Sequence, residues 1–312
     1  MPSRALHQAF LLLALGAAAA GCSVGTVLQR NGSAFFSTPA PVPHRIDKPF
    51  RADARLAVLW IGHASTLLQI DDKVILTDPV FTETIGQFSR RQVEPGLLPG
   101  ALPHVDAVLI SHMHFDHLSI GSLEMIQHKV GFLVVPQKGT VNIPDLAFET
   151  VELPTWTTFE RGGLRITAVP VQHNGFRWGI DGEWMDTSFT GYVIEYHGIT
   201  VYFGGDTAYS PDKFAATRAR FPAIDLAIMP VSPINPRSLV KSTHVDPHEA
   251  LLAFKLLGAR WMVPIHYDTF VNATDAPGEV LRVLQGEMAA QGLTGEQVRV
   301  LGIGEQQVLV PR

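Results

Sequence analysis

The chain has 312 residues, of which 46% are hydrophobic and 17% are charged. A chain of this length and composition can bury a substantial core, which excludes a disordered protein. The formal net charge of −5 provides no basic surface for a nucleic-acid backbone, so we discount DNA and RNA as partners. The 13 histidines are more than a chain of this size usually carries, and they direct attention to metal binding.

The N-terminus predicts an exported protein. Arg4 precedes an apolar run over residues 10–20, which is too short to span a bilayer and is typical of a secretion signal. The run ends in Ala19-Ala20-Gly21-Cys22, which resembles a bacterial lipobox, although the first of these positions is usually Leu. The resemblance implies a signal peptide over residues 1–22 and a lipid anchor at Cys22. Ordinary cleavage that leaves Cys22 as a free thiol is the alternative.

The segment after this cysteine predicts a location and a tether. Ser23 does not resemble the Asp that retains lipoproteins at an inner membrane, so we expect a periplasm-facing protein of the bacterial cell envelope, at the outer membrane. Residues 23–55 are rich in Pro and lack an apolar period, which predicts a linker without regular structure. Residues 56–312 show no further boundary and are expected to form one domain.

The domain alternates short β-type runs with helical stretches, which predicts an α/β fold. The mixed strand order favours two sheets packed face to face with helices outside over one doubly wound parallel sheet. Helices are predicted over residues 120–128, 212–220, 247–257 and 279–291. Strands are predicted over residues 56–61, 66–70, 74–77, 107–110, 132–135, 164–169, 191–196, 199–203, 226–229 and 261–263.

The strongest signal for chemistry lies directly after the predicted strand that ends at residue 110. Four potential metal ligands fall within six residues: His112, His114, Asp116 and His117. If this loop turns into the next helix, the first two side chains point one way and the last two another, so that one loop can serve two adjacent metal ions. Imidazole and carboxylate groups suit zinc, and the absence of cysteine here argues against a structural thiolate site.

Three further candidates each follow an apolar run: His173, Asp206 and His266. Loops at strand ends converge in space while the sheets fix their directions, so these residues can complete the same site. Two glycines before Asp206 would let the backbone pass close to the metals. Taken singly, a histidine at a strand end is more often a capped or hydrogen-bonded core residue than a ligand, and it is the pattern that favours ligands here.

This set of seven positions resembles the ligand set of the metallo-β-lactamase superfamily, in order and in type. Within it, the branch of N-acylphosphatidylethanolamine-hydrolysing phospholipase D is most similar. The blocks that carry this resemblance are W-I-G-H-A (60–64), L-T-D-P-V-F (76–81), G-D-T (205–207), H-V-D-P (244–247) and I-H-Y-D-T-F (265–270). The resemblance covers most of residues 56–312 and implies an αββα sandwich with the metals at one edge.

The resemblance also implies roles for the residues. His112, His114 and His173 would hold one metal ion, Asp116, His117 and His266 the other, and Asp206 would bridge them. Two divalent cations roughly 3.5–4 Å apart can bind one water, lower its pKa toward ~7 and clamp a substrate oxygen. Asp116 is also placed to exchange a proton, which makes it a candidate catalytic residue.

Three residues outside the ligand set have weaker signals. His244 stands at the start of a predicted helix, where it either approaches a substrate phosphate or bonds to the backbone near Asp246. His63 follows a buried strand and is interpreted as a turn residue or a neighbour of the ligands. Asp78 is expected to shape its loop or to orient a metal-ligating imidazole.

These observations predict a metal-dependent hydrolase with two divalent ions, favouring Zn²⁺. The leading substrate is a phosphodiester of the N-acyl phosphatidylethanolamine type; a lactone, a thioester, a β-lactam or a non-catalytic lipoprotein binding module are alternatives. The segment over residues 176–185 carries two Trp and one Phe, and it is either a groove for acyl chains or a hairpin packed on the core. The oligomeric state is left open.

Overall fold

The computed structural model describes residues 25–312 except residues 87–88, 182–183 and 272. The signal peptide and Cys22 lie outside the described residues. Residues 25–35 are helical, whereas the sequence predicts an irregular linker there. Arg30 and Asn31 of this helix donate side-chain hydrogen bonds to the carbonyl oxygens of Asp275 and Val271, so the segment is held against the domain. Among the helices of the described residues, none combines the length and hydrophobicity that a membrane-spanning segment needs.

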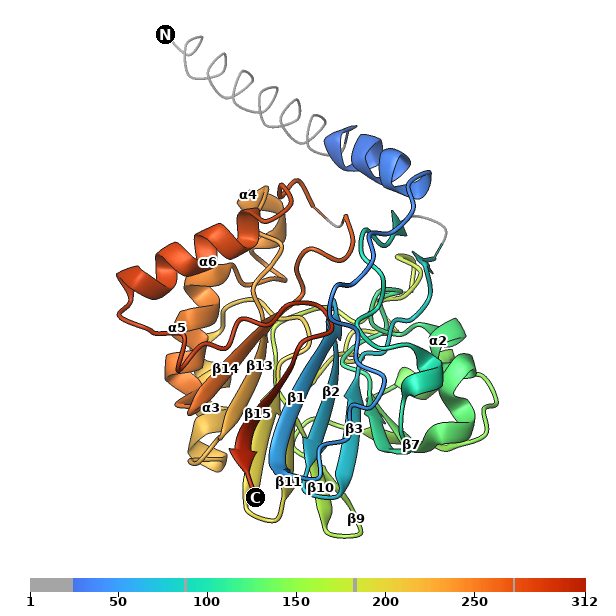
Figure 1. Ribbon diagram of the computed structural model, residues 1–312, viewed down its shortest axis with the longest axis vertical. Coiled ribbons are helices and arrows are strands. Elements are labelled where there is room, and N and C mark those ends of the chain that lie inside the picture. Colours follow the sequence, from blue (N-terminus) through green and yellow to red (C-terminus); the bar gives the residue numbers. More distant parts are fainter. Residues whose placement is uncertain (1–24, 87–88, 182–183, 272) are drawn as a thin grey trace, which may run out of the picture.

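Within the described residues, two large sheets form the domain (Figure 1). The first has seven strands in the spatial order β15-β1-β2-β3-β6-β7-β8. The second has six strands in the order β14-β13-β12-β11-β10-β9. The strands of the first sheet are β1 Ala54–Gly62, β2 Ser65–Ile70, β3 Lys73–Thr77, β6 Val105–Leu109, β7 Val130–Pro136, β8 Glu149–Leu153 and β15 Gln306–Pro311. Those of the second are β9 Thr158–Arg161, β10 Leu164–Val169, β11 Gly191–Tyr196, β12 Ile199–Phe203, β13 Leu226–Pro230 and β14 Trp261–Ile265.

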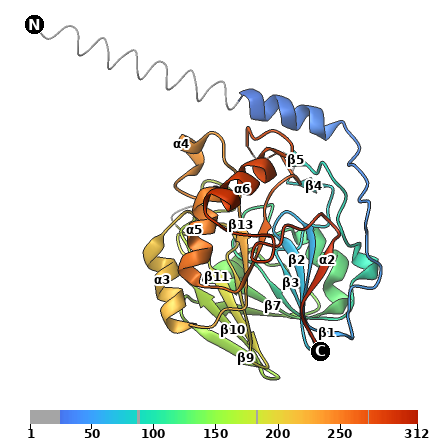
Figure 2. The ribbon, with the colours of Figure 1, turned by 60° about the vertical axis from the view of Figure 1, so that its left-hand side comes forward.

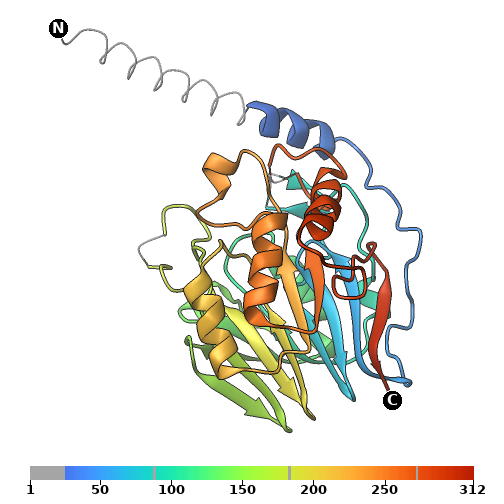
Figure 3. The ribbon, with the colours of Figure 1, turned by 90° about the vertical axis from the view of Figure 1, so that its left-hand side faces the viewer.

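Helices cover the outer faces of both sheets. Figure 2 shows α3 and α5 on one side of the molecule and α2 on the other, and Figure 3 shows α3 and α5 in front of the second sheet. The helices are α2 Ile120–Ile126, α3 Pro211–Arg220, α4 Arg237–Val240, α5 Pro247–Leu257 and α6 Glu279–Ala290, with short 3₁₀ turns over Pro99–Ala101, Gln127–Lys129 and Gly139–Asn142. A two-stranded hairpin pairs β4 Thr84–Ile85 with β5 Ser89–Arg90.

Both faces of the central strands of the first sheet are buried, and β1 shows why. Because successive strand side chains point to opposite faces, Val58 and Trp60 pack in the core shared with the second sheet, while Leu59 and Ile61 pack in the core under α2. The expected sandwich of two mixed sheets with helices outside is confirmed. The two sheets bring the ends of their strands to one edge, where the candidate ligands lie.

Local sequence explains where the helix beside that edge begins and ends. The Asp246 carboxylate caps α5 by accepting from the backbone N–H of Glu249, Pro247 occupies the first turn, and Gly258 ends the helix in a left-handed conformation with φ of 61°. The predicted bounds of this helix are therefore the observed ones.

Candidate metal centre

The loop after β6 supplies four of the candidate ligands, and a buried carboxylate holds its start. Asp78 accepts from the Ser111 backbone N–H at 2.7 Å and from the Ser111 hydroxyl at 2.6 Å. The Ser111 carbonyl in turn accepts from the Thr190 N–H at 2.8 Å, which ties the loop to the second sheet. The loop is therefore fixed on both sides before any metal is considered.

Three histidines from both sheets form a first group: His112, His114 and His173. Nε2 of His112 lies 2.8 Å from Nδ1 of His114, and Nε2 of His173 lies 3.4 Å from that same nitrogen. Two metal–nitrogen bonds of about 2.0–2.1 Å in a tetrahedral site place their nitrogens about 3.3 Å apart, so these spacings fit ligands of one ion. Two ring nitrogens that face one another in a buried site need either a shared proton or a cation between them.

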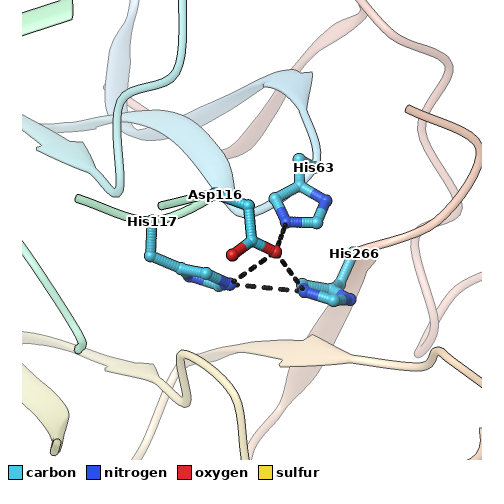
Figure 4. Close-up of side chains that lie close together, drawn as sticks. All are labelled: His63, Asp116, His117 and His266. Atoms are coloured by element: carbon cyan, nitrogen blue, oxygen red, sulfur yellow. Dashed lines mark hydrogen bonds and ion pairs between the residues drawn. The ribbon is translucent and has the colours of Figure 1, made fainter. Parts of the chain in front are cut away.

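A second group contains Asp116, His117 and His266, with His63 beside them (Figure 4). Nε2 of His117 lies 3.3 Å from Nε2 of His266. Oδ2 of Asp116 lies 3.7 Å from the first of these nitrogens and 4.0 Å from the second. The loop after β6 thus points its first two ligands toward one group and its last two toward the other, as the sequence predicts.

The Asp206 carboxylate lies between the two groups. Its oxygens are 3.1 Å from Nε2 of His266, 3.3 Å from Nε2 of His117 and 4.0 Å from Nε2 of His173. The residue follows Gly205, whose φ of +55° is left-handed and whose added Cβ would come within 2.3 Å of the Ser111 side chain. Only a glycine lets the backbone pass this close to Ser111, at the start of the loop after β6. The sequence did not identify Ser111 as the neighbour.

Hydrogen bonds behind the ligands set which ring nitrogen faces the site. Nδ1 of His117 donates to Asp78 at 2.7 Å, and Nδ1 of His173 donates to the Thr243 carbonyl at 2.8 Å. Since a carboxylate and a carbonyl are acceptors only, both Nδ1 atoms carry the proton in these bonds, and a neutral ring then offers its Nε2 lone pair to the site. This contact is the one expected of Asp78, which orients the imidazole of His117, a candidate ligand.

Burial and charge set the protonation of these groups. Burial lowers the pKa of His173 to about 3 and that of His244 to about 4, so both rings are neutral at pH 7. Burial alone would raise the pKa of Asp206, but His266 and His117 hold it well below its usual range. Burial alone would lower the pKa of His117, but Asp206 and Asp116 raise it well above its usual range. A cation that binds here replaces the proton on His117.

The structure places His244 at the site. Its Nδ1 lies 3.5 Å from Oδ2 of Asp206, and its ring centroid lies 5.2 Å from that of His173. Among the described residues this buried Nδ1 has no hydrogen-bond partner. The ring therefore does not cap the backbone near Asp246, and its Nδ1 faces the Asp206 carboxylate.

An apolar cavity of about 310 Å³ opens beside the ligand loop. It is lined by Ile85, Ser89, His114, Phe115, Asp116, Phe176 and Arg177. The hairpin considered for residues 176–185 is wrong, because the described residues there form no strand. Trp178, Ile180 and Trp184 are instead 65%, 91% and 73% exposed.

The exposed loop continues the wall of this cavity. The Trp178 ring packs edge-on against Phe115, with centroids 5.1 Å apart, and Phe115 also lines the cavity. The Arg177 guanidinium lies over the Phe115 ring and donates to the carbonyls of Met113 and Leu118. A buried carboxylate of Asp181 accepts from the two backbone N–H groups at residues 177 and 178, which fixes the base of the loop.

Comparison with known proteins agrees with this geometry. Residues 73–267 match the family described as beta-lactamase superfamily domain. An uncharacterized protein of Mycobacterium tuberculosis (strain ATCC 25618 / H37Rv) is 32% identical over 256 residues, which cover 77% of this chain and 66% of that protein. The N-acyl-phosphatidylethanolamine-hydrolyzing phospholipase D 1 of Caenorhabditis elegans is 27% identical over 75% of this chain and 70% of its own length. Further relatives are described as metal-dependent hydrolases.

A solved structure supports the fold. The isothiocyanate hydrolase from Delia radicum gut bacteria superimposes with a TM-score of 0.63 at 19% identity, covering 81% of this chain and 99% of that one. The α/β sandwich, the His/Asp cluster at its edge and the matching family together indicate a metal-dependent hydrolase. The chain belongs to the metallo-β-lactamase superfamily.

Proposed function

We propose that this protein uses two divalent metal ions, favouring Zn²⁺, to hydrolyse a phosphodiester of N-acyl phosphatidylethanolamine or a related phospholipid. The observation that carries the proposal is the pair of ligand groups that share Asp206 beside an apolar cavity. One ion would be held by His112, His114 and His173, the other by Asp116, His117 and His266, with Asp206 between them. Such a pair of ions supplies an activated water and a positive clamp on the phosphate.

The chain's own residues would bind and orient the substrate. The neutral His244, whose Nδ1 has no hydrogen-bond partner among the described residues, would donate a hydrogen bond to a non-bridging phosphate oxygen. The ionised Asp116 would orient the attacking water and take its proton. The apolar walls at Phe115 and Phe176 suit an acyl chain, and the similarity to the C. elegans phospholipase D favours this substrate class.

We further propose that the protein works at a membrane surface, attached by a lipid on Cys22 in the bacterial cell envelope. The helix over residues 25–35 begins three residues after this cysteine and lies at the end of the molecule opposite the C-terminus (Figure 1). The start of β1 lies beside the C-terminus, because Ala54 pairs with Pro311 of the antiparallel strand β15. The other end of β1, where the candidate ligands lie, is therefore also far from the C-terminus. A lipid anchor would hold the site toward the bilayer. Mass spectrometry of the mature N-terminus tests it, and an unmodified Cys22 would contradict it.

The substrate is tested with the full chain loaded with zinc and vesicles of N-acyl phosphatidylethanolamine. Water would cleave the P–O bond to the ethanolamine, so mass spectrometry should find phosphatidic acid and N-acylethanolamine in equal amounts. An Asp206→Ala variant should produce neither. If no product forms although two ions per chain are bound, the phospholipid assignment is wrong, and lactone, thioester and β-lactam substrates are then tested on the same sample.

A further inference from the structure

One buried histidine beside the candidate ligands has no role in the proposed function. His63 follows β1, is 1% exposed and has a left-handed φ of 53°, directly after Gly62 with φ of 125°. A non-glycine residue in this conformation costs free energy, and such residues persist where the surroundings fix them. The strand end therefore turns the imidazole into the site rather than along the sheet (Figure 4).

The ring of His63 contacts a ligand carboxylate. Its Nε2 lies 3.0 Å from Oδ2 of Asp116, the oxygen that also faces Nε2 of His117 and Nε2 of His266. An ionised carboxylate only accepts hydrogen bonds, so Nε2 of His63 carries the proton and donates it. Because Nε2 is engaged as a donor to Asp116, we treat His63 as the partner of that ligand, although its ring also lies close enough to Asp116, His117 and His266 to hold an ion with them.

The backbone of His63 holds a second ligand. Its carbonyl oxygen accepts from the His266 backbone N–H at 2.9 Å, and the two rings lie with centroids 4.0 Å apart. The Trp60 indole donates to that same carbonyl at 2.9 Å, and the His63 N–H donates to the Thr269 hydroxyl at 2.7 Å. Since His63 follows β1 of the first sheet and His266 follows β14 of the second, these bonds join the ends of the two sheets at the site.

We propose that His63 is a positioning residue that holds Asp116 and His266 in place for the second metal ion and so sets the affinity of that half of the centre. The inference rests on the proposed two-ion site. In this proposal His63 aligns the Asp116 carboxylate, from the loop after β6, with the His266 imidazole, which follows a strand of the opposite sheet. Loss of such a partner behind a ligand typically lowers metal affinity or activity about 10- to 100-fold.

Two amide substitutions of His63 distinguish the effect of losing the hydrogen-bond donor at Nε2 from the effect of losing the ring. The amide nitrogen of Gln reaches the position of an imidazole Nε2, whereas that of Asn reaches only the position of Nδ1. The full chains of the wild type, His63→Gln and His63→Asn are stripped of metal and titrated with Zn²⁺ against a chromophoric chelator. We expect His63→Asn to weaken one of the two sites about 10- to 100-fold and leave the other unchanged, and His63→Gln to restore most of the loss.

Other results overturn the proposal. Wild-type affinity at both sites in both variants, with only a lower melting temperature, would make His63 purely structural. Complete loss of one ion in both variants would make it a direct ligand. The readout is metal affinity, so it is independent of phospholipid hydrolysis; failure of the proposed substrate would instead appear as two tightly bound ions without product.

A measurement on the wild type covers the case in which the variants do not fold. Imidazole ¹⁵N NMR of the metal-free and zinc-loaded chain reports which ring nitrogen carries the proton. We expect Nε2 of His63 to be protonated in both states. A deprotonated Nε2 that shifts on zinc binding would overturn the assignment.

Discussion

Asp78 and His117 form a fully buried pair in which Nδ1 of the imidazole donates to the carboxylate at 2.7 Å. The carboxylate follows β3 and the imidazole follows β6, so two neighbouring parallel strands of one sheet fix the ring. The bond turns Nε2 of His117 toward His266 and Asp206.

An Asp78→Asn substitution should therefore weaken metal binding. The amide would present N–H groups to Nδ1 of His117, which favours the ring form with its proton on Nε2, the atom needed by the metal. We expect metal affinity to fall about 10- to 100-fold, measured by chelator competition. Asp106→Asn, at the start of β6 and away from the site, is the control; equal losses in both variants would contradict the role of Asp78.

Gly205 and Gly204 offer a matched pair for the turn that carries Asp206. An added Cβ at Gly205 would meet Ser111 within 2.3 Å at a left-handed φ, whereas at Gly204 its nearest neighbour lies at 3.4 Å. We expect Gly205→Ala to lower the free energy of unfolding by about 2–4 kcal/mol and Gly204→Ala to cost far less. Urea unfolding of the metal-free proteins measures both, and equal costs would contradict the argument.

The metal-free protein should lose stability as the pH falls below about 6.5. Burial lowers the pKa of His173 to about 3 and of His244 to about 4 in the folded chain, so only the unfolded chain takes up these protons between pH 6.5 and about 4. The unfolding free energy then falls by up to about 1.4 kcal/mol per pH unit for each group. His244→Gln should remove the contribution of one group, up to about 1.4 kcal/mol per pH unit, from that slope. Urea unfolding at a series of pH values measures it. An unchanged slope would show that His244 is protonated in the folded state.

Asp116→Asn should reduce turnover more than it reduces metal content. The amide keeps an oxygen for a metal ion but cannot take a proton from water. We expect kcat on the phospholipid to fall about 100-fold or more while two ions remain bound, measured by product formation and elemental analysis of the same sample. Retained turnover at full metal content would remove the proton-transfer role.

The exposed indoles of Trp178 and Trp184 should bind lipid. Trp favours the interface between water and bilayer, and the loop that carries both residues adjoins the apolar cavity. We expect Trp178→Ala with Trp184→Ala to weaken vesicle binding and activity on vesicles, and to spare activity on a short soluble phosphodiester. Met125→Ser, at an exposed position on α2, is the control. Equal losses on vesicles and on soluble substrate would point to a defect in the cavity instead.

The pattern of apolar residues was sufficient to predict the strands around the site. The predicted runs over residues 164–169, 191–196 and 199–203 coincide with β10, β11 and β12, because these runs are mostly apolar and most of their side chains are buried. The strands β8 and β9 were missed since their residues are largely exposed or half-buried and lack an apolar pattern. The helix over residues 25–35 was missed because no apolar stripe marks it; it is held by hydrogen bonds to residues some 240 positions away.

The site residues likewise divide into those that the sequence predicts and those that only the structure reveals. His112, His114, Asp116 and His117 are close in sequence and could be predicted as one cluster, and the structure also brings His173, Asp206 and His266 to it. The contact of His63 with Asp116 spans 53 residues and depends on a left-handed turn that no local pattern encodes. The available signal was its place at a strand end after a glycine, which it shares with Asp206.

The division of the ligands between two sheets has a consequence for how the protein holds together. His117 and His266 are separated by 149 residues, so an ion that joins them closes a very long loop, as a disulfide would. Closing a long loop restricts the unfolded chain more than closing a short one. Metal would therefore act as a removable cross-link between the halves of the domain. The β1–β15 pairing and the shared core also join the two halves, so a chain nicked between β8 and β9 should stay assembled on chelation but unfold at a lower urea concentration than with metal bound.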